Sequence, residues 1–189
     1  MSTLGLSGEP IQKNNRFKSL LWPEIHTASD IDTLHAQGFW ICQFIAFMSA
    51  IFLILTSHFV LASIVFGFFF LGSMGVREGS LSAIAVVFSA YFLDGLAILR
   101  IFNFFSIVRL IVIALLLANW RGTILAQRWK KRQTPESLIL PARFSENWRD
   151  RYCDQLPRIA WPRVKYIFYL LAFIVIFAEL ITILLIYFH

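Results

Sequence analysis

Four ionisable side chains interrupt the long apolar runs of this sequence. Asp94, Arg100 and Arg109 lie in the stretch YFLDGLAILRIFNFFSIVRL, and Glu179 lies in the last apolar run. A charge at the centre of a bilayer costs about 2.5–3.5 kcal/mol on insertion scales, so such residues pair with one another or line a path for ions, protons or a polar substrate. Their positions decide what chemistry the chain could carry.

Asp94 and Arg109 are predicted to lie at the same depth in a membrane. They stand equally far from RIFN (residues 100–103), where a turn between two spans is expected. At the helical rise of about 1.5 Å per residue, both lie roughly 10 Å below that turn. We expect an Asp94–Arg109 ion pair that clasps the two spans, rather than a catalytic site.

Glu179 is expected in the same layer. Counted from the start of its own span, Glu179 lies about 24 Å into the membrane, and Asp94 lies about 22 Å into the third span. Glu179 is then predicted to pair with Arg100, with Arg109 or with a neighbouring subunit. The functional alternatives are a relay for ions or protons and a pocket for a polar substrate.

Membrane-spanning helices are the elements that must position these residues. Hydrophobic residues make up 58% of the 189 residues, whereas soluble domains contain about 45–50%. A span needs about 20 residues, so the apolar blocks at 38–76 and 81–120 each hold two spans, and a fifth ends the sequence. We predict an all-α, polytopic transmembrane helix bundle of about five spans. The expected spans are 38–56, 59–76, 80–99, 103–120 and 164–189.

The chain divides into four predicted parts. These are a cytoplasmic or interfacial N-terminal tail (1–37), a four-span bundle (38–120), a basic cytoplasmic surface segment (121–163) and a fifth transmembrane helix (164–189). Ser29, followed three residues later by an acid, is a capping signal from which a helix can run into the first span. Short helices near the headgroups are expected in the basic segment.

Basic residues set the predicted orientation of the bundle. All of the 17 Lys and Arg except Arg100 and Arg109 fall on one side of the five spans, as do the six tryptophans. Cytoplasmic loops carry the excess of Lys and Arg, and Trp gathers at membrane interfaces. The N-terminus is therefore predicted to be cytoplasmic and His189 to lie outside.

The basic face has two candidate partners. A net positive surface attracts anionic lipid headgroups, and we expect this contact. The alternative is an acidic surface of a protein partner. The Lys/Arg run RWKKR (128–132) is short and adjoins a membrane exit, so binding of nucleic acid is not expected.

The sequence contains no HExxH, Walker A or GxGxxG motif. Only His58 lies near a span, which excludes a haem held by two histidines of one chain. His58 could ligate a single metal or a chlorophyll, but a polar turn residue is the expectation. Cys42 and Cys153 are expected to be free thiols. We predict a non-enzyme in which no cofactor or metal site is identified.

Small residues mark the surfaces where helices are expected to pack. Gly72, Gly75 and Gly79 close the second span, and Ser82 and Ser89 share a face of the third. Small side chains let helix backbones approach closely. We expect packing within the chain, with contact to another subunit as the alternative.

The first two-thirds of the chain resembles an uncharacterised family of small bacterial four-span inner-membrane proteins. The resemblance covers about residues 34–132 and rests on LHAQGFWICQFIAFMSA, on FLGSMGVREGSLSAIAVVFSAYFLDGL and on LLLANWRGTILAQR. It implies a bacterial inner-membrane location and little about activity. The extension at 133–189, with the fifth span, departs from the family pattern. The matching residues are Gly75, Arg77, Ser80, Arg121, Gly122 and Thr123.

Two functions agree with these observations. The first is a non-enzymatic accessory or scaffold subunit that contacts other membrane protein subunits in a larger complex. The 20 phenylalanines would suit contact with lipids, quinones or pigments, as in a respiratory or photosynthetic complex. The alternative is a small oligomeric transporter or channel that uses Asp94, Arg109 and Glu179, although the sequence shows no inverted repeat or broken helix of the kind many transporters have.

Overall fold

The computed structural model describes residues 25, 28–98, 104–132 and 151–188. Every element in these ranges is a helix, and four helices are long and apolar enough to cross a membrane, which confirms the predicted all-α transmembrane bundle. One further apolar helix, at Leu81–Leu96, is shorter. The elements are α2 (Ala28–Leu55), α3 (Phe59–Arg77), α4 (Leu81–Ile98), α5 (Phe104–Arg132), the π-helical turn η2 (Arg151–Gln155) and α7 (Leu156–Phe188).

Three helices extend beyond the predicted spans. α2 begins at Ala28, next to the predicted start signal at Ser29, so the end of the expected tail is already helical. α5 continues to Arg132 and α7 begins at Leu156, so both described ends of the expected basic surface segment are helical. A helix as long as α5 measures about 43 Å, more than the roughly 30 Å of a bilayer core. The expected turn at RIFN lies outside the described residues.

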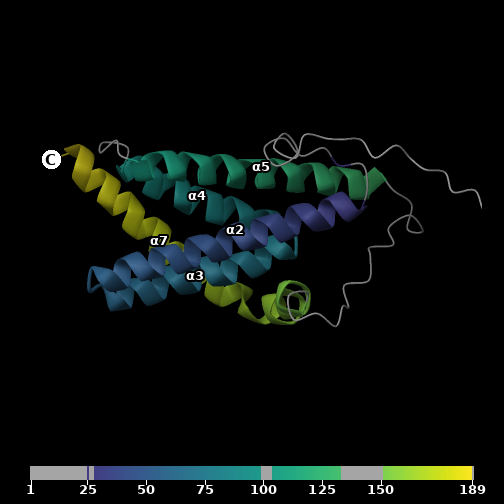
Figure 1. The fold of residues 1–189 in the computed structure, drawn as a ribbon, viewed down its shortest axis with the longest axis horizontal. Coiled ribbons are helices and arrows are strands. Elements are labelled where there is room, and N and C mark those ends of the chain that lie inside the picture. Colours follow the sequence, from purple (N-terminus) through teal and green to yellow (C-terminus); the bar gives the residue numbers. More distant parts are fainter. Residues whose placement is uncertain (1–24, 26–27, 99–103, 133–150, 189) are drawn as a thin grey trace, which may run out of the picture.

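The bundle consists of two antiparallel hairpins and one further helix (Figure 1). α2 pairs with α3 and α4 pairs with α5; in addition α2 packs on α5, and α7 packs on α3 and α4. α2 and α4 begin at the end of the bundle where α3 and α5 finish (Figure 1). We call it the basic end, because Lys130, Lys131 and Arg132 form the last turn of α5 there.

The start of α2 and the end of α7 lie at opposite ends of the bundle (Figure 1). A chain that crosses the bundle an odd number of times must begin and end on opposite sides, so this arrangement agrees with the five predicted spans. Which of the two ends faces the cytoplasm stays a prediction that rests on the distribution of Lys and Arg.

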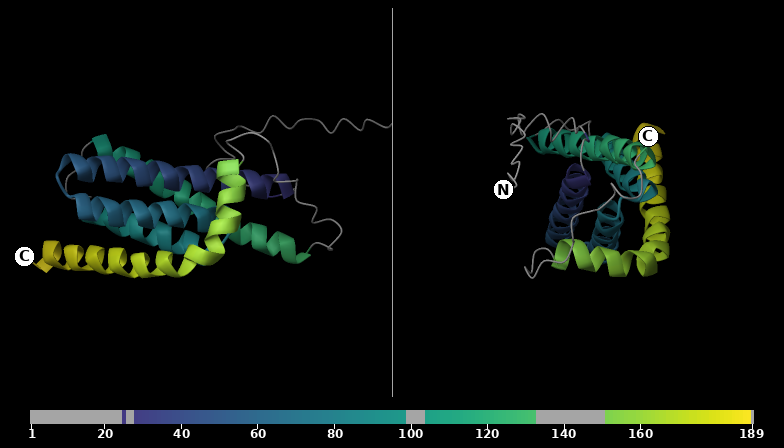
Figure 2. Two further views of the ribbon diagram at one scale, coloured as in Figure 1. Left: turned by 90° about the horizontal axis from the view of Figure 1, so that it is seen from below. Right: turned by 90° about the vertical axis from the view of Figure 1, so that its right-hand side faces the viewer.

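α7 changes direction within its first third (Figure 2). Its first turns lie across the basic end, and the remainder runs past α3 and α4. Pro162 stands inside this part of the helix, where a proline removes one backbone hydrogen bond and bends the axis. Because η2 precedes α7 directly, the place where η2 docks sets the place from which α7 starts.

Aromatic side chains fill the contact between α3 and α7. The rings of Phe68 and Phe168 are stacked with their centroids 5.4 Å apart, and both side chains are fully buried. Trp161 packs against Phe168 at 5.5 Å. This cluster holds the bent helix α7 against the first hairpin.

Glycines of α3 make that contact possible, as the sequence predicts. A methyl group added at Gly75 would lie 2.5 Å from the Trp161 ring and 2.6 Å from the Ala83 side chain. At Gly72 it would lie 2.7 Å from Val87. All three distances are too short for real contacts, so α4 and α7 approach α3 only because these positions carry no side chain.

The other predicted packing residues behave differently. Gly79 has a φ of 68°, a backbone conformation that favours glycine, and forms the turn between α3 and α4. The Ser82 hydroxyl lies 2.6 Å from the Tyr169 hydroxyl and joins α4 to α7. Ser89 is exposed, so the packing expected of it within the chain is not found. The buried side of α4 is turned away from Ser89 and carries Ala83, Ile84, Val87 and Ala90.

The change Gly75→Ala should destabilise the protein by about 1–3 kcal/mol, the usual cost of overpacking a filled core. The matched control is Gly67→Ala on the same helix, because a methyl group there would lie an ordinary 3.5 Å from Leu171. The measurement is the midpoint of thermal unfolding in detergent, followed by the loss of helical circular dichroism. Equal midpoints for the two variants would contradict the close approach at Gly75.

Candidate functional site

The predicted ion pair between Asp94 and Arg109 is present. Arg109 Nη1 lies 2.5 Å from Asp94 Oδ2 and 3.4 Å from the Asp94 carbonyl oxygen. The contact joins the last turns of α4 to the first turns of α5. The Asp94 side chain keeps 35% of its surface exposed and the Arg109 side chain keeps 30%, so protein atoms cover this pair only in part.

Glu179 of α7 lies near this pair. The charges of Asp94 and Arg109 both act on the Glu179 carboxyl, which is half-buried. Among the described residues, no basic group forms an ion pair with Glu179. Arg100, the other predicted partner, lies outside the described residues. We call Asp94, Arg109 and Glu179 the outer charge cluster; its ion pair joins α4 to α5, and its second acid stands on α7.

A small cavity lies beside Arg109, between α4 and α5. Its volume is about 70 Å³, enough for a few water molecules but well below the roughly 300 Å³ at which ligand pockets begin. Apart from Arg109 and Ser106 its walls are apolar, and they include Phe92, Leu96 and Ile113. The cavity does not accommodate a substrate of metabolite size.

A second set of charges lies at the basic end, around the buried side chain of Arg77. Only 1% of Arg77 is exposed. Its Nη2 lies 3.0 Å from Asp32 Oδ1, and its Nη1 donates to the Asp32 carbonyl at 2.8 Å. Its Nε donates to Asp154 Oδ1 at 3.1 Å and to the Cys153 carbonyl at 3.3 Å. Nη2 also pairs with the Asp154 carboxylate.

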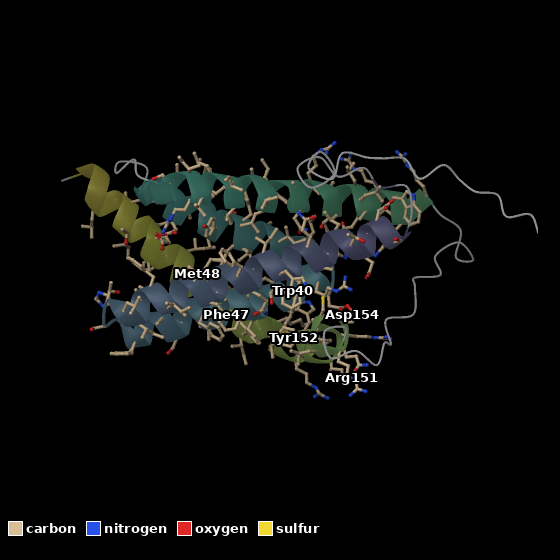
Figure 3. All side chains as sticks on the ribbon, viewed as in Figure 1. Trp40, Phe47, Met48, Arg151, Tyr152 and Asp154 are labelled. Carbon is tan, nitrogen blue, oxygen red and sulfur yellow. The ribbon has the colours of Figure 1, made fainter. Side chains whose placement is uncertain are left out.

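We call Arg77, Asp32 and Asp154 the Arg77 cluster. It joins the first turns of α2, the last turn of α3 and η2. Figure 3 labels Asp154 and Tyr152 of η2 together with Trp40 of α2. The rings of Tyr152 and Trp40 lie 6.0 Å apart, so η2 docks on α2 through an aromatic contact as well. A buried guanidinium that binds two carboxylates and two carbonyls in this way stabilises the packing of α2, α3 and η2; we call this contact the Arg77 fastening.

Sequence reasoning missed the Arg77 cluster for a physical reason. Arg77 is the last residue of an apolar run, where a basic residue normally faces the headgroups. Its two acidic partners are 45 and 77 residues away. Nothing local indicates these pairings, since they depend on how α2 and η2 pack against the end of α3.

Three buried polar residues could have been recognised from the sequence as helix contacts, because each interrupts an apolar run. Gln43 Nε2 donates to Ser73 Oγ at 2.7 Å and links α2 to α3. Asn119 Nδ2 donates to the Leu34 carbonyl at 2.8 Å and links α5 to α2. All three side chains are buried. In lipid there is no hydrophobic driving force between helices, so hydrogen bonds of this kind contribute to holding the helices together.

The remaining candidates do not join either charge cluster. His58 is exposed at the turn between α2 and α3, and its side chain makes no capping hydrogen bond at the start of α3. Cys42 and Cys153 are buried free thiols. In the described ranges, no group of three His, Cys, Asp or Glu side chains is placed to hold a metal ion.

Comparison with known proteins finds no matching family model, no matching curated protein and no matching solved structure. The resemblance of residues 34–132 to small four-span inner-membrane proteins therefore stays a prediction. The two charge clusters have to be interpreted from their own geometry.

The change Asp94→Asn should lower stability more than it changes any activity, because it removes the ion pair with Arg109 that joins α4 to α5. The expected loss is up to about 2.5–3.5 kcal/mol, the cost of an isolated charge on insertion scales. The measurement is folding yield and thermal midpoint in detergent. Removing the second charge with Arg109→Gln should restore much of the loss. An unchanged midpoint in the single variant would rule out the clasp.

The change Arg77→Gln should destabilise the protein by about 3–5 kcal/mol, the usual result of removing one partner from a buried ion pair. Arg77→Lys should recover only part of this, since an ammonium cannot reproduce the fork that serves Asp32 and Asp154. The control is Arg128→Gln, an exposed position of α5, for which a change within about 0.5 kcal/mol is expected. Denaturant titration in mixed micelles measures all three, and a matching effect of R77Q and R128Q would refute the fastening.

Proposed function

We propose that this chain is a non-enzymatic accessory or scaffold subunit of a larger membrane protein complex. The observation that carries the proposal is the outer charge cluster, which stands partly uncovered beside an apolar helix. Lipid tails satisfy apolar side chains but provide no partner for charges. A surface that combines both is better matched by another protein.

α7 supplies the apolar part of this surface. In the most apolar 18-residue stretch of this segment, only 17% of the residues are buried within the chain, compared with 44% in the corresponding stretch of α3. Large side chains along the helix are exposed, among them Phe173, Phe177, Leu180 and Leu184. Because α7 also carries Glu179, apolar contact area and an acidic group lie on one helix.

The finer assignments belong to the same proposal. The distribution of Lys and Arg favours a cytoplasmic basic end in contact with anionic headgroups. The resemblance of residues 34–132 favours a bacterial inner membrane. The high phenylalanine content favours a respiratory or photosynthetic assembly, in which lipids, quinones or pigments lie against such surfaces.

A second candidate is a small oligomeric transporter or channel. Three ionisable side chains from three helices gather in one layer, and the cavity beside Arg109 has room for water. Ionisable residues at this depth are a common feature of proton and ion paths. The size of the cavity limits this alternative to ions, protons or water.

Purification in mild detergent from the native membrane, followed by native mass spectrometry, distinguishes the two functions. A scaffold should bring other membrane subunits with it in a fixed ratio. The pair Phe177→Ala and Leu184→Ala should release them, whereas Phe52→Ala and Leu55→Ala, at still more exposed positions of α2, should not. A protein that purifies as a lone homo-oligomer and gives liposomes a Glu179-dependent ion flux would establish the second candidate instead.

A further inference from the structure

We propose that η2 and the first turns of α7 lie along the membrane surface and bind anionic phospholipid headgroups, and that the last turn of α5, although strongly basic, does not. This inference rests on the proposed function, which puts anionic headgroups at the basic end, and it names the segment that binds them. Four observations support it: the length of α3, the course of α7, the side chains exposed there and the distance to the end of α5.

The length of α3 sets the level of one membrane interface. α3 runs from Phe59 to Arg77, which is about 28 Å of helix, and the hydrocarbon core of a bilayer is about 30 Å thick. Both ends of α3 therefore lie close to an interface, and Arg77 marks the one at the basic end. Trp161 lies against Gly75 at this end, in agreement with the gathering of Trp at membrane interfaces.

The start of α7 runs across the bundle at this level instead of along it. Both views of Figure 2 show these first turns on the outer side of the bundle, before the helix bends. Asp154 of η2 binds Arg77, and Trp161 of α7 lies against Gly75, so both ends of the stretch are held close to the interface. A helix in this position lies in the plane of the membrane, and we call residues 151–163 the in-plane segment.

The in-plane segment exposes apolar and basic side chains together. Leu156 is 37% exposed and Ile159 is 62% exposed. Its single acid, Asp154, binds Arg77. Its three arginines are all exposed: Arg151, Arg158 and Arg163. Helices that lie in a membrane interface combine apolar side chains, which enter the acyl boundary, with Lys and Arg, which attract anionic headgroups, so this composition fits an anionic lipid surface.

The end of α5 lies too far from the interface to take the same role. Arg77 donates to the Asp32 carbonyl, and Asn119 donates to the Leu34 carbonyl. Because α2 and α5 are antiparallel, the level of Arg77 falls about two residues beyond Asn119 on α5. The last turn of α5, Lys130–Arg132, then lies about 14–17 Å further along the helix, and Figure 2 shows the end of α5 beyond the in-plane segment. The attraction of a charged membrane falls off within a Debye length, about 10 Å at 0.1 M salt.

The test places a fluorescent dye at Ile159→Cys in the full chain, reconstituted in phosphatidylcholine vesicles; the two native cysteines are buried. The probes are phosphatidylglycerol and phosphatidylcholine with a nitroxide quencher on the acyl chain, each added as a minor fraction of the lipid. Both should quench the dye, and phosphatidylglycerol should be enriched about fivefold around it, the effect of one Lys or Arg at the membrane surface. A dye at Lys131→Cys should be quenched by neither lipid, because this position lies beyond the headgroups.

Two variants with the same loss of charge assign the preference to one segment. The in-plane variant replaces the three exposed arginines with Gln: Arg151→Gln, Arg158→Gln and Arg163→Gln. The α5 variant replaces the basic residues of the last turn of α5: Lys130→Gln, Lys131→Gln and Arg132→Gln. The in-plane variant should lose the preference for phosphatidylglycerol and the α5 variant should keep it. In the chain without these changes, 1 M salt should also remove the preference but leave quenching by phosphatidylcholine unchanged, a result that does not depend on the folding of any variant.

Three results would overturn the inference. They are a dye at residue 159 that neither lipid quenches, equal quenching by the two lipids, and a preference that survives in the in-plane variant. Inorganic phosphate that cancels the preference more than chloride of the same ionic strength would overturn it too, because the site would then be one for soluble anions. If native subunits co-purify in a fixed ratio but no lipid preference is seen, this inference fails and the scaffold function stands. If no subunits co-purify, the scaffold function fails whatever the quenching shows.

Discussion

The ion pairs of Arg77 hold together the part of the molecule from which the rest is positioned. The guanidinium joins α2, α3 and η2, and it loses almost all contact with water in doing so. η2 leads directly into α7, and the Phe68–Phe168 stack then guides α7 along α3. The course of α7, and with it the position of Glu179, therefore depends on where the Arg77 cluster holds η2.

The two charge clusters have the same composition but different surroundings. Each contains two carboxylates and one guanidinium. At the basic end, the two acids enclose a guanidinium that is almost fully buried. At the other end, the Asp94 and Arg109 side chains keep 35% and 30% of their surface exposed, respectively. The same types of charged group therefore lie in the protein interior at one end and partly uncovered at the other.

Much of the architecture could be predicted because membrane insertion depends on local composition. The apolar runs predicted the spans, and the symmetry of Asp94 and Arg109 about RIFN predicted their contact. The extension of α5 to Arg132, the burial of Arg77 and the exposure of Ser89 could not be predicted in this way. These features depend on contacts between segments far apart in the sequence, and helical periodicity carries no information about them.

The unequal lengths of α4 and α5 have a consequence for the surrounding bilayer. The apolar part of α4, Leu81–Leu96, spans only about 24 Å, less than the roughly 30 Å of a typical hydrocarbon core. A short apolar helix thins the bilayer around it or packs against neighbouring proteins. Asp94 lies near the end of this helix, so local thinning brings water closer to its carboxylate. Bilayer thickness thus becomes a variable that changes the energetic cost of burying the outer charges.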